Sequence, residues 1–301
     1  MRWRTMTPGE RERAYSPSSV LPDGDYGPFV AAYRRESDEA WTRVRATAGA
    51  TTVVLPYGDR ESQTIDVAVP AAAGTPVGSA DAGAPPLLAF IHGGYWQELS
   101  KLDSRFAAAD CVDRGWAFAA IDYTLAPDAT VDEIVDECRR AMRSLHAAAD
   151  ELGVDPGRIV VSGSSAGAHL AAMAALDPVA PAGHLAAAVL LSGVYELEPL
   201  IGTSIDEAVA LDVETAHRLS PLRADLDGFP PTLVVHGENE TTEFVAQSHA
   251  MADALRLVDV PVSTLEIPDR NHFDVVLALA QRGTRLGDSV AELVEHVTRR
   301  R

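Results

Sequence analysis

Residues 158–170 read RIVVSGSSAGAHL, a short apolar run followed by a G-x-S-x-G turn and a run of helix-forming residues. A strand, a sharp turn and a helix in this order place the central serine, Ser165, at the end of a buried strand and at the N-terminus of a helix. Backbone amides at a helix N-terminus favour negative charge, which a serine nucleophile develops on its substrate. A serine that only caps a helix in a tight turn gives the same pattern. The strand before the turn and the helix after it favour the nucleophile.

Nearly continuous apolar runs alternate with helical patterns on both sides of this turn. The predicted strands are residues 87–93, 116–123, 158–164, 186–193, 231–237 and 262–268. The predicted helices are residues 101–114, 130–152, 166–176, 241–258 and 272–300. Strands that are apolar along their whole length are typical of a parallel sheet buried on both faces. The alternation therefore predicts an α/β fold with a mostly parallel central sheet and helices on both faces.

The remaining segments stand outside this alternation. Residues 1–30 are polar and proline-rich, which predicts an N-terminal arm packed over the body or a partly flexible lead, and a helix follows over 31–48. Residues 51–58 and 63–70 are typical of a β-hairpin around Gly58 and Asp59, and residues 71–86 of an exposed loop. Residues 196–230 contain short helical pieces where a cap or lid would lie. We expect one domain over residues 1–301.

The composition limits the partners. The chain has 301 residues and a formal net charge of −19, which disfavours nucleic acid and anionic membranes and leaves a small molecule as the expected substrate. Cys111 and Cys138 are too few and too far apart for a disulfide framework or a zinc site, so we expect no metal. No signal-peptide run and no span of about 18 apolar residues is present, so the expected location is the cytoplasm. If the chain forms an oligomer, we expect a homodimer, because two-fold dimers are the commonest soluble oligomers.

A glycine pair follows the predicted strand 87–93, in His92-Gly93-Gly94-Tyr95-Trp96. Adjacent glycines let the backbone turn so that its amides point into a cleft, where they can stabilise an oxyanion. We expect Gly93 to make the turn, and the amides of Gly94 and Tyr95 to act with the amide of Ala166. His92 could be a base, but an imidazole that holds the loop in place is the favoured interpretation.

A serine nucleophile needs an imidazole and an acid, which this fold supplies after the serine in the chain. His272 directly follows the last apolar run, and the catalytic base is favoured there over a helix-capping histidine. Glu240 is the preferred acid because its offset from the strand 231–237 fits, although a glutamate that complements a helix dipole is the alternative. Glu238 and Glu196 are the rival acids.

Together these residues resemble the kynurenine formamidase, or arylformamidase, branch of the α/β-hydrolase family, which lies close to the HGGG esterases. The resemblance rests on HGGYW at 92–96, GSSAGAHL at 163–170, ENETTEF at 238–244 and NHFD at 271–274. It implies hydrolysis of N-formyl-kynurenine to kynurenine and formate without a cofactor. It also implies that Ser165 is the nucleophile, that His272 is the base, and that Glu240 stands where the family has an aspartate.

A formyl group needs almost no acyl pocket, whereas an aryl leaving group needs an aromatic wall. Trp96, Tyr95, Tyr195 and Phe244 are the predicted wall, with packing beneath the loops as the alternative. A carboxylesterase acting on small or natural-product esters is the second functional hypothesis, favoured by the altered acid. A non-catalytic binder on the same fold is the third, and the presence of both Ser165 and His272 disfavours it.

Overall fold

The computed structural model describes residues 2–71, 83–181 and 183–299, and its centre is an eight-stranded sheet. The spatial order is β1-β2-β4-β3-β5-β6-β7-β8. The hairpin β1–β2 is antiparallel and joins β4 antiparallel, whereas all strands from β4 to β8 run parallel. The bounds are β1 Thr51–Pro56, β2 Thr64–Val69, β3 Leu87–Ile91, β4 Ala117–Ile121, β5 Ile159–Ser164, β6 Ala187–Leu191, β7 Thr232–Asn239 and β8 Val262–Asn271.

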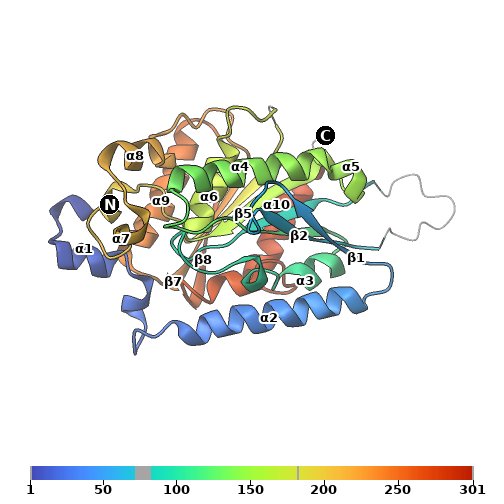
Figure 1. Cartoon of the computed structure of the whole chain (residues 1–301), viewed down its shortest axis with the longest axis horizontal. Coiled ribbons are helices and arrows are strands. Elements are labelled where there is room, and N and C mark those ends of the chain that lie inside the picture. The colour runs from blue at the N-terminus through green and yellow to red at the C-terminus, as the bar shows by residue number, and fades with distance from the viewer. Residues whose placement is uncertain (1, 72–82, 182, 300–301) are drawn as a thin grey trace.

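Helices cover both faces of the sheet, as the alternation predicted (Figure 1). One face carries α4 (Val131–Ala147), α6 (Ala166–Ala175) and α9 (Thr242–Leu257), and the other carries α2 (Gly27–Ala46), α3 (Ala108–Asp113) and α10 (Arg285–Arg299). The inner strands β3, β4, β5 and β6 are buried along their whole length, which explains their continuous apolar sequences. The predicted α/β-hydrolase architecture is confirmed.

Two predicted helices are shorter than expected. Within 101–114, a 3-10 turn at Lys101–Asp103 precedes α3, and within 272–300, a 3-10 turn at Val275–Ala278 precedes α10. Gly283 has a φ of 75° in the second break. A Cβ at Gly287 would lie 2.0 Å from the carbonyl oxygen of Gln281. The chain thus passes closely against the first turn of α10, which a single continuous helix could not do.

The other flanking segments follow the predictions with changes at their ends. The hairpin β1–β2 forms, but its connection runs over residues 57–63 and is not a turn at Gly58 and Asp59 alone. The helix expected over 31–48 begins earlier, at Gly27, because Pro28 suits a first helical turn. Of the predicted loop 71–86, residues 72–82 lie outside the described residues. Cys111 and Cys138 are buried and free.

The N-terminal arm packs across the carboxyl end of the sheet, beside the segment 196–230. Its helix α1 (Pro8–Ala14) begins with a capping box of Thr7 and Glu10. The Tyr15 backbone carbonyl accepts a hydrogen bond from the Tyr95 hydroxyl, and the Ala14 carbonyl accepts one from Thr241. Figure 1 shows α1 next to α7 (Asp206–Val209), at the opposite end of the molecule from the hairpin strand β1. Of the two open alternatives for residues 1–30, the packed arm is the one observed.

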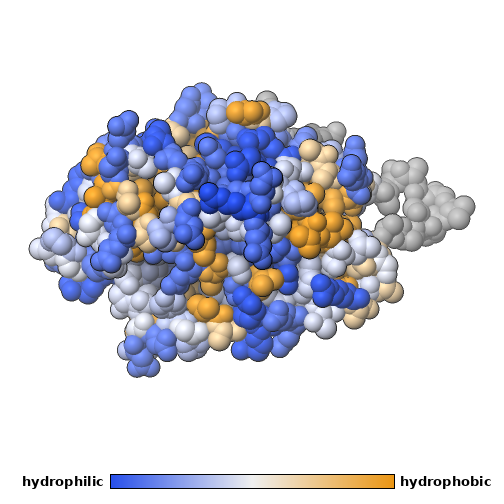
Figure 2. Space-filling view, in the orientation of Figure 1, coloured by the Kyte–Doolittle hydropathy of each residue, from blue (hydrophilic) through white to orange (hydrophobic). Residues whose placement is uncertain are grey.

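The surface in this view is mostly hydrophilic, with scattered apolar patches (Figure 2). One patch lies over the edge strand β1, where Val53 and Val54 are 40% and 60% exposed. Among the described residues, no helix is long and apolar enough to span a membrane. The homodimer stays a prediction.

Candidate active site

Ser165 stands on a strained turn between β5 and α6. Its φ of 58° and ψ of −122° are unfavourable for a residue with a side chain. A Cβ at Gly163 would lie 2.1 Å from the carbonyl oxygen of Gly167, and a Cβ at Gly167 would lie 2.1 Å from that of Ile91. Both glycines are therefore required for the chain to turn this sharply. The Ser165 amide donates to Leu191 on β6, which fixes the turn to the neighbouring strand.

The glycine loop after β3 lies directly against this turn. A Cβ at Gly93 would lie 2.7 Å from the Ser164 carbonyl oxygen and 3.1 Å from the Ser165 Cβ. The Tyr123 hydroxyl lies 3.1 Å from the carbonyl oxygens of both His92 and Gly93, so it holds the loop from below. The loop and the serine therefore approach more closely than any side chain at position 93 would allow.

The predicted oxyanion amides lie at this contact. Gly94 has a φ of 89°, and Tyr95 has a φ of 47° although it carries a side chain, so the backbone turns sharply at both residues. Over residues 2–71, 83–181 and 183–299, the amides of Gly94, Tyr95 and Ala166 donate to no protein acceptor. Free backbone donors beside a nucleophile can stabilise a developing oxyanion.

His272 follows β8 on a short turn closed by Asn271. The Asn271 side-chain oxygen accepts hydrogen bonds from the amides of Phe273 and Asp274, and the Asn271 amide donates to the Asp274 carboxylate. The Phe244 ring packs edge-on at 4.5 Å from the His272 ring. These contacts fix the imidazole, which is buried at the wall of the same cavity as Ser165. Within the described residues, no hydrogen bond joins the side chains of Ser165 and His272.

Glu240 reaches His272 from the loop after β7. Its Oε2 lies 3.0 Å from His272 Nδ1. Its Oε1 accepts the Ser192 hydroxyl at 2.5 Å and the Gly237 amide at 2.6 Å. Because a carboxylate only accepts, the contact with His272 places the imidazole proton on Nδ1 and leaves Nε2 free to accept another.

The environment keeps Glu240 ionised. Burial by itself raises the pKa of this carboxyl group. The hydrogen bond and charge of His272, with the Ser192 and Gly237 donors, outweigh burial, and the pKa lies below its ordinary value. The carboxylate can therefore stabilise a neighbouring imidazolium. Ser192, which follows β6 with a φ of 48°, was not singled out from the sequence. The only sequence feature that points to Ser192 as a site residue is its position directly after a buried strand.

The structure places the rival residues elsewhere. Glu238 is exposed and accepts the Asp269 amide at 2.9 Å. Glu196 pairs with Arg223 at 2.9 Å and so is held away from His272. His92 stacks on Tyr123 with ring centres 4.1 Å apart, and its Nδ1 lies 3.0 Å from the Gly93 carbonyl oxygen. The geometry of His92 fits an imidazole that holds the loop.

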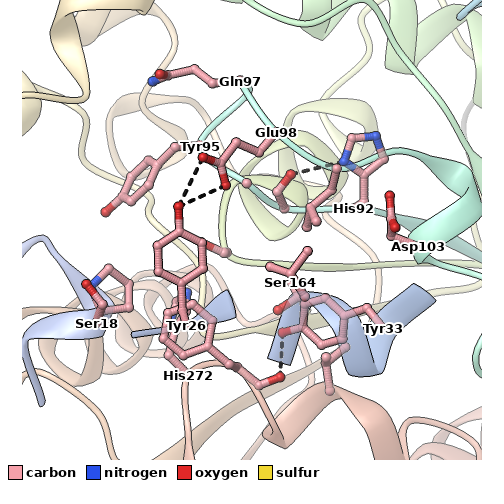
Figure 3. A pocket seen from close by; sticks show the side chains of 18 of the residues that line it. Ser18, Tyr26, Tyr33, His92, Tyr95, Gln97, Glu98, Asp103, Ser164 and His272 are labelled. Atoms are coloured by element: carbon pink, nitrogen blue, oxygen red, sulfur yellow. Dashed lines mark hydrogen bonds between the residues drawn. The ribbon is translucent and has the colours of Figure 1, made fainter. Parts of the chain in front are cut away.

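Ser165, His272 and the glycine loop open onto one cavity of about 290 Å³ (Figure 3). Its aromatic lining residues are Tyr26, Tyr33, Phe90, Tyr95, Phe106 and Phe273. Tyr26 and Phe29 of the N-terminal segment both stack on Phe273, at 5.6 and 5.4 Å. Ser204 and Ile205 bring the predicted cap segment to the same wall. Within the described residues, no group of three or more His, Cys, Asp or Glu side chains could hold a metal ion.

The aromatic wall therefore differs from the predicted one. Of the four predicted residues, only Tyr95 lines the cavity. Trp96 has a φ of 61°, which turns its ring into the core, where it packs edge-on against His169 at 5.2 Å. Tyr195 is fully buried, with its hydroxyl folded back over Gly193, and Phe244 lies behind His272. Two of the rings that line the cavity, those of Tyr26 and Tyr33, come from the N-terminal part of the chain, whose position over the site no local pattern indicates.

Comparisons with known proteins agree with this architecture. A family model described as the α/β hydrolase fold matches residues 88–275. Kynurenine formamidase of Salmo salar is 32% identical, covering 91% of this chain and 92% of that protein, and kynurenine formamidase of Danio rerio is 29% identical, covering 97% and 98%. A thermostable carboxylesterase cloned from a metagenomic library shares the fold, with a TM-score of 0.67 and 22% identity over 89% of this chain and 95% of that chain.

The chain therefore belongs to the α/β-hydrolase family, and it is a serine hydrolase that acts on small molecules. Within that family it falls in the kynurenine formamidase-like branch, as the resemblance of its motifs indicated.

Proposed function

We propose that this protein is an arylformamidase that hydrolyses N-formyl-kynurenine to kynurenine and formate through Ser165, His272 and Glu240. The observation that carries the proposal is the 3.0 Å contact between His272 Nδ1 and Glu240 Oε2 in the wall of the cavity that Ser165 lines. The likeness to two kynurenine formamidases along nearly the whole chain supports the choice of substrate.

The first half of the reaction acylates the serine. His272 Nε2 accepts the Ser165 hydroxyl proton while Oγ attacks the formyl carbon, and the carbonyl oxygen becomes an oxyanion. The amides of Gly94, Tyr95 and Ala166 would donate to that oxyanion. The C–N bond then breaks, and His272 gives its proton to the departing arylamine. Glu240 keeps the imidazole in the required tautomer and stabilises its charged form throughout.

The second half releases formate. A water molecule gives a proton to His272 and attacks the formyl carbon of the acyl-enzyme. The second tetrahedral intermediate collapses, Ser165 Oγ takes the proton back from His272, and formate leaves. A formyl group needs almost no acyl pocket beside Ser165. The aromatic rings of Tyr26, Tyr33 and Phe273 would receive the aryl leaving group.

A paired assay tests the proposal. The purified protein is given N-formyl-kynurenine and p-nitrophenyl acetate separately, with Ser165→Ala as the control. We expect the formamide to be hydrolysed with the higher kcat/KM, and Ser165→Ala to abolish both reactions. An unchanged rate in Ser165→Ala would overturn the assignment of the nucleophile.

A carboxylesterase acting on small or natural-product esters is the second candidate. It is favoured by the aromatic cavity, which among its described lining residues contains no Lys or Arg side chain to receive the carboxylate of an amino-acid substrate. Hydrolysis of the acetate alone in the same assay would select this candidate and leave the roles of Ser165 and His272 standing.

A further inference from the structure

The charged side chains in the cavity wall are carboxylates. Glu12, Glu98 and Asp103 line the cavity, and none of its described lining residues is Lys or Arg. Asp103 is neutralised, because Arg34 pairs with it at 2.8 Å and the Ser100 hydroxyl donates to it. Neither Glu12 nor Glu98 forms an ion pair within the described part of the chain, but both oxygens of Glu12 accept hydrogen bonds from Ser204, which leaves Glu98 to meet a ligand. The cavity therefore carries an uncompensated negative charge.

Glu98 is held at the mouth of the cavity by two elements. Its backbone amide donates to the Gly94 carbonyl oxygen at 3.0 Å, which ties it to the glycine loop. The Tyr26 hydroxyl donates to its carboxylate, at 3.1 and 3.3 Å to the two oxygens (Figure 3). Tyr26 in turn stacks on Phe273, next to His272. A substrate that enters between these rings must pass the Glu98 carboxylate.

The depth of the site fixes which end of a substrate meets this carboxylate. Ser165 and His272 are buried, whereas Glu98 is exposed and Tyr26 is 36% exposed. The acyl carbon must reach Ser165, and a formyl or acetyl group occupies little space beyond that point. The leaving group therefore extends outward, past the aromatic rings, toward Glu98.

We propose that Glu98 selects leaving groups that carry an ammonium group and no carboxylate, so that the preferred substrates are aryl formamides, or aryl esters, with a cationic side chain. The proposal rests on the proposed function, because it takes Ser165 as the nucleophile. An ammonium group would form a charge-assisted hydrogen bond with Glu98, and the faces of Tyr26 and Phe273 attract a cation as well. An anionic side chain would meet like charge and find no basic partner. An amino-acid side chain, with both charges, would fall between these extremes.

The test is a charge series of 2-formamidophenyl ketones that share one reacting group. Their side chains carry an amine alone, no charge, an amino acid, or a carboxylate alone. We expect kcat/KM to fall in that order, with the cationic compound about tenfold better than the anionic one, the size of one charge-assisted hydrogen bond. Added salt should reduce the cation-to-anion ratio, which is kcat/KM of the cationic compound divided by that of the anionic one, because the mouth of the cavity is exposed to solvent.

Three variants test whether the charge of Glu98 causes the cation-to-anion ratio. Glu98→Gln should bring the cation-to-anion ratio close to one, since glutamine keeps the acceptor for Tyr26 and loses the charge. Glu39→Gln is the matched control, because it removes the same charge from an exposed position on α2, and it should keep the ratio. Tyr26→Phe removes one of the two contacts that hold Glu98 but keeps the ring and the carboxylate, so it should lower the ratio less than Glu98→Gln does.

The same series prepared as aryl acetates separates this proposal from the proposed function. Hydrolysis of the acetates alone, with the cationic preference and its loss in Glu98→Gln, would reject the formamidase and support the role of Glu98. A preference for the anionic compound, or a cationic preference that survives in Glu98→Gln, would overturn the role of Glu98 whichever series reacts. Hydrolysis that does not depend on Ser165 would overturn both.

Discussion

Replacing Glu240 by glutamine tests the assignment of the acid most directly. A glutamine can keep its oxygen toward the Ser192 hydroxyl and the Gly237 amide, which now lie 2.5 and 2.6 Å from Oε1. Its NH₂ group then faces His272 Nδ1, where the carboxylate oxygen lies at 3.0 Å. Nδ1 must then accept, the imidazole proton moves to Nε2, and His272 can no longer take the proton of Ser165.

The expected loss follows from that tautomer. The corresponding aspartate-to-asparagine change in a serine protease lowers kcat about 10⁴-fold. We expect Glu240→Gln to lower kcat by about 10³- to 10⁴-fold, or about 4 to 5.5 kcal/mol in the activation free energy. The assay is the steady-state rate on whichever of the formamide and the acetate the wild-type protein hydrolyses, with circular dichroism to show that the variant is folded.

Glu238→Gln is the matched control for this measurement. It lies two residues before Glu240, near the end of β7, but it is exposed and its side chain accepts the Asp269 amide. We expect its kcat to stay within about threefold of the wild type, as surface changes away from a site usually do. A Glu240→Gln variant that keeps more than a tenth of the wild-type kcat would refute the reasoning. An equal loss in Glu238→Gln would move the acid to that residue.

Three further changes test the surroundings of the site. Gly93→Ala should lower kcat by about 10²- to 10³-fold, because its Cβ, 2.7 Å from the Ser164 carbonyl oxygen, displaces the loop that carries the proposed oxyanion donors; an active variant would show that the loop can move without loss. Ser192→Ala should lower the free energy of unfolding by about 2 kcal/mol in urea titrations, since a buried carboxylate loses a donor, and no change would mean that water replaces the hydroxyl. Acidification tests the lowered pKa of Glu240: its contribution to stability is fully present above the ordinary pKa of 4.5 and is lost as the pH falls through the lower folded-state pKa. The free energy of unfolding of Glu240→Gln should therefore fall less than that of the wild type over that pH range. If the two free energies fall in parallel with pH, the lowered pKa of Glu240 is contradicted.

Much of the fold and the positions of the reacting groups follow from local sequence. A strand buried on both faces must be apolar along its length, so β3, β5 and β6 can be recognised without tertiary information. Because the carboxyl ends of parallel strands meet at one edge of the sheet, residues just after such strands gather there. Ser165 and His272 each follow one of these strands directly, and that is why their meeting in one cavity could be predicted.

The lining of the cavity could not be predicted in the same way. Trp96 belongs to the predicted wall, but its positive φ turns the ring inward, and sequence alone gives no sign of such a φ in a tryptophan. Tyr26 reaches the mouth through contacts with Glu98 and Phe273, which are 72 and 247 positions away in the chain. Side chains that meet only through tertiary packing leave no periodicity or motif to recognise.

The end of β7 holds Glu240, the residue that the resemblance sets where the family has an aspartate. The pairing of β7 with β8 shifts register between Gly237 and Asn239, just before Glu240. A Cβ at Gly237 would lie 2.4 Å from the carbonyl oxygen of Arg270, so the two strands come together here more closely than a side chain would allow. The longer glutamate curls back to accept the Gly237 amide and still meets His272, two residues beyond Arg270. One oxygen of the Glu240 carboxylate is thus fixed by the end of β7, and this contact directs the other oxygen to the imidazole.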